Sequence, residues 1–165
     1  MRGIDPITFQ VISTGLTGIV REMQLLLFRT GYSTAIRESQ DASCAILDRQ
    51  GNLVAQFRSL YMHMGIFRVM MDAVFERYPV SEMEQGDVFI LNHPYHGGST
   101  HVSDMGVIVP VFYHGEHVAF CASMAHKTDV GGVVPGSASG QATEIYQEGL
   151  LLPPLKYVSH GGISQ

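Results

Sequence analysis

The histidines of this chain are concentrated in one short stretch. Six of the eight lie between His93 and His126, with Asp104 inside this stretch and Asp129 just after it. Packing gives no reason to gather imidazoles, because each buried ring needs hydrogen-bond partners for both nitrogens. Metal ligation does give a reason, since imidazole nitrogen and carboxylate oxygen are common ligands of zinc, manganese and ferrous iron. The clustering therefore predicts a divalent-metal site.

The strongest local unit in this stretch is His101-Val102-Ser103-Asp104. A three-residue separation lets two ligands converge from a tight turn or a single helical turn, so a third ligand must come from another element. Met105–Tyr113 and His117–Met124 are expected to pair as a hairpin joined through residues 114–116. In that hairpin residue 126 falls opposite residue 104, which brings His126 beside Asp104. Because His-x-x-Asp is frequent by chance, the predicted hairpin carries most of this prediction.

The remaining histidines give weaker signals. His93 stands on a loop before Pro94-Tyr95 and could contact a substrate, whereas His96 is more typical of a turn. His114 and His117 flank the predicted hairpin turn and are typical of a solvated surface. His63 and His160 are isolated along the chain and receive no role.

Motifs for other chemistries are absent from the sequence. Cys44 and Cys121 form no CxxC pair and are typical of reduced, inert thiols. The chain has no GxxxxGK[ST] motif, and its glycines at 131, 132 and 136 fit no dinucleotide fingerprint. Nucleotide binding by this chain alone is therefore not expected.

Regular elements that could position these residues follow from the hydrophobic periodicity. Asp5 and Pro6 are expected to start a long amphipathic helix, with apolar residues at three- and four-residue steps, that ends near Gly31. A second hairpin is expected from strands at 44–47 and 53–55. A short central helix is expected at 66–74 and a further strand at 87–91. We therefore predict an α+β fold with a long N-terminal helix, antiparallel β-hairpins and a short central helix.

Composition limits the class of protein. The chain has 165 residues, the size of one domain, and 45% hydrophobic against 15% charged residues excludes intrinsic disorder. A net charge of −5 disfavours nucleic-acid binding, and the short apolar runs predict no membrane span and no secretory signal. These features favour a cytoplasmic protein. The low charge density and the apolar run Leu150–Leu155 near the end favour the N-terminal piece of a larger subunit.

Six ordered blocks of the sequence follow a known family pattern, namely Asp5–Thr8, Arg37–Ala45, Asp87–Tyr95, Gly97–Asp104, Ala125–Gly132 and Thr143–Leu150. Together they resemble the hydantoinase B family. That family includes subunits of ATP-dependent N-methylhydantoinases, half of 5-oxoprolinases, caprolactamase, and subunits of acetone and acetophenone carboxylases. The resemblance implies one hydantoinase-B-type N-terminal domain over residues 1–165, truncated at its C-terminal end.

The resemblance also implies a division of labour and a set of site residues. A partner, the hydantoinase A-type ATPase subunit, binds ATP and phosphorylates the substrate, so a hetero-oligomer is expected, and the present subunit completes the reaction at a metal. Family ligands correspond to Asp41, His101, Asp104 and His126, of which Asp41 is implied by the resemblance alone. Asp129 or His93 could orient a ligand or carry a proton. Lys127 departs from the family pattern, which often has a second histidine there.

Three functions remain open at the level of the sequence. The leading one is a metal-binding subunit of an ATP-dependent amidohydrolase that opens a hydantoin, 5-oxoproline or a lactam. The second is a subunit of an ATP-dependent ketone carboxylase of the acetone or acetophenone type. The third is a non-catalytic assembly piece with a structural metal.

Overall fold

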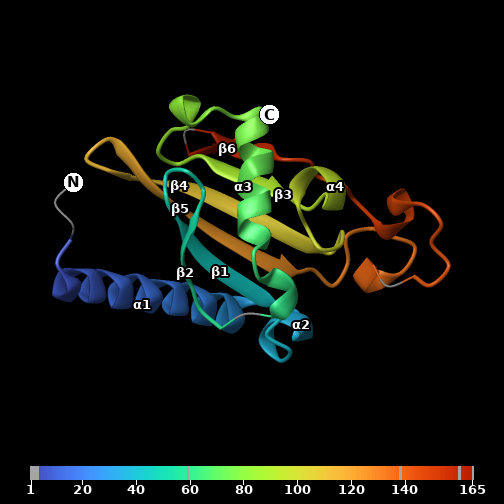
Figure 1. The fold of residues 1–165 in the computed structure, drawn as a ribbon. Helices are drawn as coiled ribbons and strands as arrows, with labels where there is room; N and C mark the ends of the chain where they lie inside the picture. Colours follow the sequence, from blue (N-terminus) through green and yellow to red (C-terminus); the bar gives the residue numbers. More distant parts are fainter. Residues whose placement is uncertain (1–3, 59, 138, 160, 165) are drawn as a thin grey trace.

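An antiparallel sheet forms the centre of the molecule (Figure 1). The structure is a computed structural model that describes residues 4–58, 60–137, 139–159 and 161–164, so His160 lies outside the described residues. Within these ranges the sheet has seven strands in the order β2-β1-β5-β4-β3-β6-β7. The strands are β1 Ala42–Leu47, β2 Leu53–Gln56, β3 Val88–Leu91, β4 Asp104–Tyr113, β5 Glu116–His126, β6 Leu155–Ser159 and β7 Gly162–Ile163.

Helices and short 3-10 turns connect these strands, so the predicted α+β class is confirmed. The long N-terminal helix and the central helix lie where the periodicity predicts them. The helices are α1 Pro6–Thr30, α2 Thr34–Arg37, α3 Ile66–Arg77 and α4 Pro94–Gly97, and the 3-10 turns are η1 Tyr61–His63, η2 Val80–Glu82, η3 Pro135–Ser137 and η4 Ile145–Glu148.

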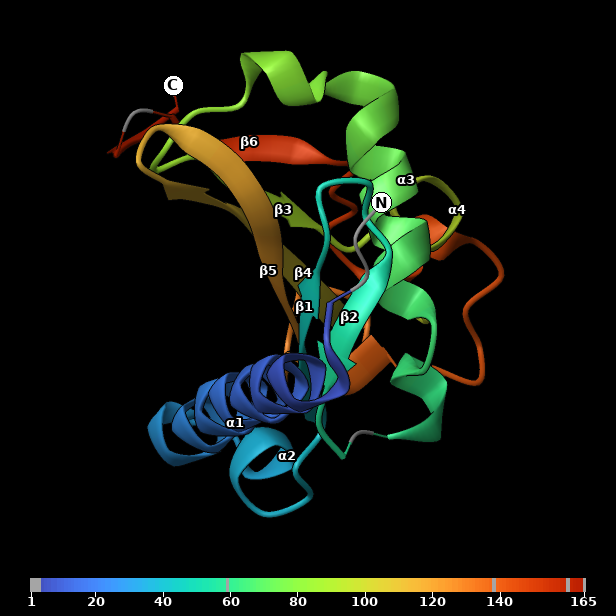
Figure 2. The ribbon, with the colours of Figure 1, turned by 60° about the vertical axis from the view of Figure 1, so that its left-hand side comes forward.

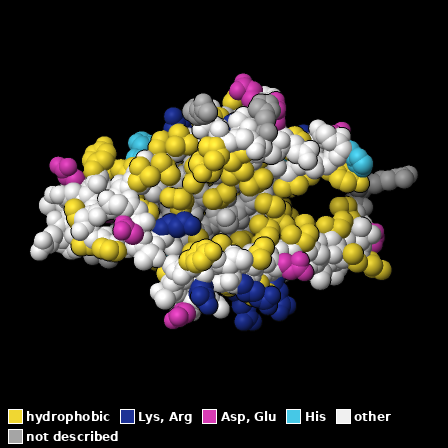
Figure 3. All heavy atoms as spheres, turned by 180° about the vertical axis from the view of Figure 1, so that it is seen from behind, with side chains coloured by type: hydrophobic (Ala, Val, Ile, Leu, Met, Phe, Trp, Pro, Cys, Tyr) yellow, Lys and Arg dark blue, Asp and Glu magenta, His cyan; other side chains and the backbone are white. Residues whose placement is uncertain are grey.

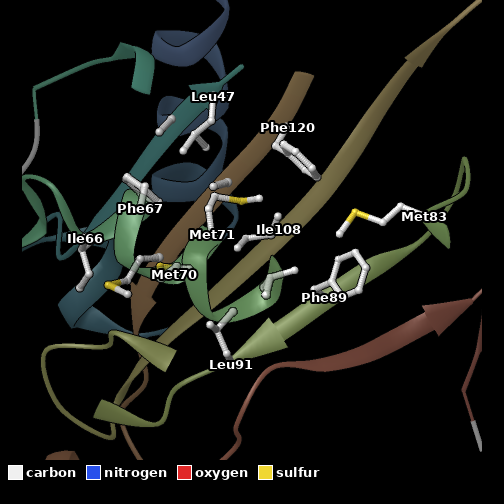
Figure 4. Close-up of a cluster of buried hydrophobic side chains, with 14 residues drawn as sticks. Leu47, Ile66, Phe67, Met70, Met71, Met83, Phe89, Leu91, Ile108 and Phe120 are labelled. Carbon is white, nitrogen blue, oxygen red and sulfur yellow. The ribbon is translucent and has the colours of Figure 1, made fainter. Parts of the chain in front are cut away.

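The sheet lies between α1 and α3 (Figure 2). Strand β1 is buried over its whole length because both of its faces are covered. Its alternate residues Ala45 and Leu47 belong to the core under α3, whereas Cys44 and Ile46 pack with Val20 of α1. Figure 4 shows the larger core, in which α3 side chains meet side chains from the central strands. Two-sided packing therefore fixes β1, the strand that begins next to Asp41.

Helix α1 has the predicted start and end. The Asp5 side chain accepts hydrogen bonds from the backbone N–H groups of Ile7 and Thr8, Pro6 occupies the first turn, and Gly31 follows the last residue. By length and composition the helix could also cross a membrane, and only 11% of its most apolar window is buried in this structure. The sequence prediction overlooked this because polar residues, among them the pairs Ser13-Thr14 and Arg21-Glu22, interrupt the apolar run. A single helix of this kind is a weak signal, since buried core helices of soluble proteins and signal sequences near an N-terminus meet the same criteria.

The β4–β5 hairpin is confirmed, with one correction to its turn. Glu116 already belongs to β5, so the turn holds only His114 and Gly115, whose φ angles of 50° and 81° suit a tight hairpin. Near the turn Phe112 pairs with His117, but the next pair joins Val111 to Ala119. The extra residue on β5 is a β-bulge. It restores the register that a three-residue turn would have given.

Hydrophobic side chains also gather on the face seen from behind (Figure 3). Helix α1 contributes exposed apolar residues to the surface, including Ile7, Val11 and Leu26. Contiguous exposed apolar surface is uncommon on isolated soluble domains. It agrees with the prediction that part of this surface is covered in a larger assembly, which stays a prediction.

Two glycines in open space separate the effect of backbone conformation from that of packing. A Cβ at Gly15 or at Gly115 meets nothing within 4 Å, but only Gly115 has a positive φ. We expect Gly15→Ala to raise the free energy of unfolding by about 0.5–1 kcal/mol, because alanine is the better helix former. Gly115→Ala is expected to lower it by about 1 kcal/mol, because an L side chain strains the left-handed conformation. Urea unfolding measures both, and destabilisation by Gly15→Ala would show that α1 packs against a further element.

Candidate metal centre

The neighbouring strands β1, β5 and β4 begin or end at the same end of the sheet, where they place three of the predicted residues in a row. Ala42 pairs with Ala125, so Asp41, one residue earlier, lies beside the end of β5. There the N–H of His126 donates to the carbonyl of Asp41 at 3.1 Å. On the other side of β5, His126 pairs directly with Asp104, the first residue of β4. Antiparallel pairing alone thus brings together residues 41, 104 and 126.

The fourth predicted residue, His101, reaches the row from the turn that precedes β4. The N–H of Asp104 donates to the His101 carbonyl at 3.1 Å, and the Ser99 hydroxyl lies 2.9 Å from the same carbonyl oxygen. This tight turn sets the His101 Nε2 atom 3.2 Å from Asp104 Oδ1. The predicted convergence at a three-residue spacing is therefore present in the structure.

A fifth side chain, His63, joins the cluster without having been predicted. Its fully buried ring lies 2.7 Å from the Ser43 hydroxyl through Nδ1, and its Nε2 is 3.5 Å from Asp104 Oδ2 and 3.9 Å from Asp41 Oδ1. The turn η1 that carries it follows β2, far from the other ligands along the chain. No spacing in the sequence connects His63 with them. Only the tertiary fold reveals it.

Donor distances in the cluster match those around a small divalent cation. Two ligand atoms that share a tetrahedral Zn²⁺ at about 2.0 Å lie about 3.3 Å from each other. Asp104 Oδ1 is 3.2 Å from His101 Nε2 and 3.3 Å from His126 Nδ1, and Asp41 Oδ2 is 3.8 Å from the same His126 atom. Asp41 Oδ1 is buried and has no hydrogen-bond partner among the described residues. His101, Asp104 and His126 each place one donor atom within 4.8 Å of the other two, which fits a divalent metal, and Asp41 lies beside this group, within reach of His126.

Hydrogen bonds keep the central carboxylate ionised. Burial by itself raises the pKa of the Asp104 carboxyl, but the nearby donor groups of His101, His63 and Thr100 outweigh it and hold that pKa well below its ordinary value. The same hydrogen bond to Asp104 raises the pKa of His101 against the opposing effect of burial. Asp104 is thus a charged oxygen donor at neutral pH, as metal ligation requires.

Three of the four predicted ligands are partly accessible. Side-chain exposure is 30% for His101, 25% for Asp41 and 17% for His126, whereas Asp104 is fully buried. His126 borders an open cavity of about 590 Å³ together with Leu27, Ile36 and Asp129. His101 borders a second cavity of about 310 Å³. Small molecules can therefore approach the cluster from the imidazole side.

The structure gives His93 and Asp129 local contacts. His93 Nδ1 accepts hydrogen bonds from the N–H groups of Tyr95 and His96 and so caps α4. Asp129 accepts a hydrogen bond from the Gly131 N–H and lines the larger cavity. Within the described part of the chain, neither side chain forms a hydrogen bond, ion pair or ring contact with the clustered residues.

Comparison with known proteins places this fold and these residues in context. The profile of the hydantoinase B/oxoprolinase family matches residues 5–165. The chain is 38% identical to 5-oxoprolinase of Dictyostelium discoideum over 96% of this chain and 12% of that protein. It is 36% identical to the caprolactamase beta subunit of Pseudomonas jessenii over 98% of this chain and 27% of that protein.

Two solved structures share the fold of this chain. A crystal structure of the ATP-dependent caprolactamase from Pseudomonas jessenii matches with a TM-score of 0.89 and 34% identity, over 98% of this chain and 28% of that chain. Nucleotide-free acetone carboxylase matches with a TM-score of 0.83 at 20% identity, over 97% and 21% of the two chains, which shows a shared fold. The chain spans between 11% and 29% of the length of the curated relatives it matches.

Asn92 holds the His101 turn in place, and its replacement tests that link. Its buried amide donates to the carbonyls of Val102 and Leu150 at 2.8 Å each, and its oxygen accepts from the Leu152 N–H at 2.6 Å. Asn92→Asp keeps the shape but sets a carboxylate against two carbonyls. We expect it to lower the free energy of unfolding by about 2–4 kcal/mol in urea titrations.

Gln10→Glu on the exposed face of α1 makes the same amide-to-carboxylate change as a control. It should alter the unfolding free energy by less than about 0.5 kcal/mol. Equal losses in the two variants would contradict the role of Asn92.

Proposed function

The chain belongs to the hydantoinase B/oxoprolinase family, and on this premise we propose that it carries the metal centre of an ATP-dependent enzyme that opens cyclic amides. The observation that supports the proposal most directly is the convergence of His101, Asp104 and His126, with Asp41 beside His126, at one end of the sheet. Relatives named as a 5-oxoprolinase and as the beta chain of a caprolactamase support the substrate class.

In this proposal Asp41, His101, Asp104 and His126 hold one divalent cation, with zinc, manganese and ferrous iron as candidates. When bound, such a cation supplies Lewis acidity that polarises a substrate oxygen and lowers the pKa of a water. Asp104 contributes an ionised oxygen from a fully buried position. His101 and His126 present the edge of the centre that borders the two cavities.

Asp129 is the better candidate for carrying a proton to or from the substrate. Its exposed carboxylate lines the cavity that His126 borders. His93 uses Nδ1 to cap α4, so only its Nε2 is free for such a role, and burial lowers the pKa of its ring. Lys127 also lines the larger cavity, and its positive charge suits an anionic, phosphorylated substrate.

Activation of the amide is assigned to a partner. The sequence has no phosphate-binding motif, and relatives are named as single subunits of a caprolactamase and of a putative D-/L-hydantoinase. We infer an ATPase subunit of the hydantoinase A type that takes up ATP, phosphorylates the substrate and forms a cytoplasmic hetero-oligomer with this chain. Ring opening then takes place beside the cluster described above.

Cation uptake tests the proposed centre. The purified protein, stripped with a chelator and titrated with Zn²⁺ or Mn²⁺, is expected to bind one equivalent. His101→Ala and Asp104→Asn each remove a donor and should weaken binding by at least about 100-fold, as measured by calorimetry and elemental analysis. His96→Ala removes an exposed imidazole outside the cluster and serves as the matched control. Unchanged binding in the first two variants would refute the centre.

The reaction class is tested on the full-length subunit with its ATPase partner. We expect ADP release to depend on a cyclic amide, with hydantoin, 5-oxoproline and caprolactam as the probes, and to fall at least about 100-fold in His101→Ala. Release stimulated instead by acetone with bicarbonate would replace the amidohydrolase with a ketone carboxylase. Full turnover in a variant that has lost its cation would identify the centre as structural.

A further inference from the structure

His63 faces the candidate metal centre from inside the protein. Its side chain has no exposed surface, and a buried imidazole needs a partner for each ring nitrogen. Nδ1 has one, the Ser43 hydroxyl at 2.7 Å. Nε2 is buried without a hydrogen bond that meets normal geometry, yet it points at two carboxylates.

In each of these carboxylates, one oxygen faces the predicted imidazole ligands and the other faces His63. Asp104 turns Oδ1 toward His101 and His126, and Oδ2 toward the interior, where His63 Nε2 lies at 3.5 Å. Asp41 turns Oδ2 toward His126 at 3.8 Å, and its buried, unpaired Oδ1 lies 3.9 Å from His63 Nε2. One nitrogen therefore sits behind both acidic side chains.

The surroundings of His63 select one tautomer of its neutral ring. If the Ser43 hydroxyl donates to Nδ1, the ring proton is on Nε2, where it faces Asp41 and Asp104. In the opposite tautomer a lone pair on Nε2 would face two carboxylates, which is repulsive. The Nε2–H form is thus the one that this site stabilises.

We propose that His63 is a positioning residue for the metal centre, whose Nε2–H holds the inner oxygens of Asp41 and Asp104 so that their outer oxygens face one cation. The inference rests on the proposed function, because it presupposes a cation among the four predicted ligands. Partners of this kind, which fix the orientation of ligating side chains, typically affect metal affinity by about 10- to 100-fold. Asp104 also receives the Thr100 hydroxyl on its inner oxygen, so Asp41 depends more heavily on His63.

A competing arrangement would use His63 as a ligand. The donor atoms of Asp41, His63 and Asp104 lie within 4.8 Å of one another, and this group shares Asp104 with the group formed by His101, Asp104 and His126. Two cations bridged by Asp104 would need Nε2 unprotonated. Metal stoichiometry separates the two arrangements.

The experiment compares three variants of the purified protein by Zn²⁺ calorimetry and by the visible spectrum of the Co²⁺ form. His63→Leu fills the site without a donor and should weaken Zn²⁺ binding about 10- to 100-fold, with one equivalent still bound. His63→Gln carries an N–H donor at a position similar to that of Nε2 and should stay within about threefold of wild type. Ser43→Ala leaves the ring in place, loses tautomer control and should fall between them, which keeps the test valid if His63→Leu does not fold.

The outcomes distinguish this proposal from the proposed function. Loss of affinity in His63→Leu, with rescue by His63→Gln and an altered Co²⁺ spectrum, supports the positioning role. Wild-type affinity in His63→Leu, while His101→Ala loses the cation, overturns the role of His63 and leaves the centre intact. Two equivalents in wild type and one in His63→Leu also overturn it, in favour of a ligand. Retention of the cation by His101→Ala overturns the centre itself.

Discussion

The register between β4 and β5 is the constraint on which the rest of the candidate site depends. It sets His126 directly opposite Asp104, and β1 then adds Asp41 on the far side of β5. With the two-residue turn alone, Asp104 would pair with Ala125. The register next to the turn, where Phe112 pairs with His117, is shifted by one residue from the register at the site. The β-bulge on β5 supplies the missing residue. Since side chains alternate between faces, a slip of one residue would turn His126 away from its partners.

Burial then gives this arrangement its electrostatic character. Strand β1 is covered by α1 and α3, and the cores on both of its faces extend to the end where the site lies. Two carboxylates in such surroundings lose much of their hydration, which is costly unless positive charge or hydrogen-bond donors replace it. Asp104 has donors on both oxygens, whereas Asp41 Oδ1 has none within hydrogen-bonding range. A divalent cation offsets both charges at once, so its binding is expected to be coupled to the stability of the fold.

The elements were predictable from the sequence where local signals agree. Asp5, Pro6 and Gly31 mark the ends of α1, and the hairpin around Gly115 correctly predicted the approach of His126 to Asp104. The turn was predicted one residue too long, but the β-bulge on β5 restores the predicted register at the site. No residue pattern predicts this bulge. Asp41 gives no signal in spacing, because it meets the others through a strand that pairs across a long stretch of chain. Here only the family resemblance identified it.

His63 was missed for a physical reason rather than for lack of a motif. Asp104 and His126 are held by the pairing of two strands adjacent in the chain, whose periodicity can be read from the sequence, but a residue that acts from behind them is selected by packing. Its turn η1 lies between β2 and α3, and the α3 core residues Ile66 and Phe67 fix where that turn sits against the sheet. The position of His63 therefore follows from the hydrophobic core rather than from the site. In this fold the core decides which donor reaches the inner oxygens, and strand register decides which reaches the outer ones.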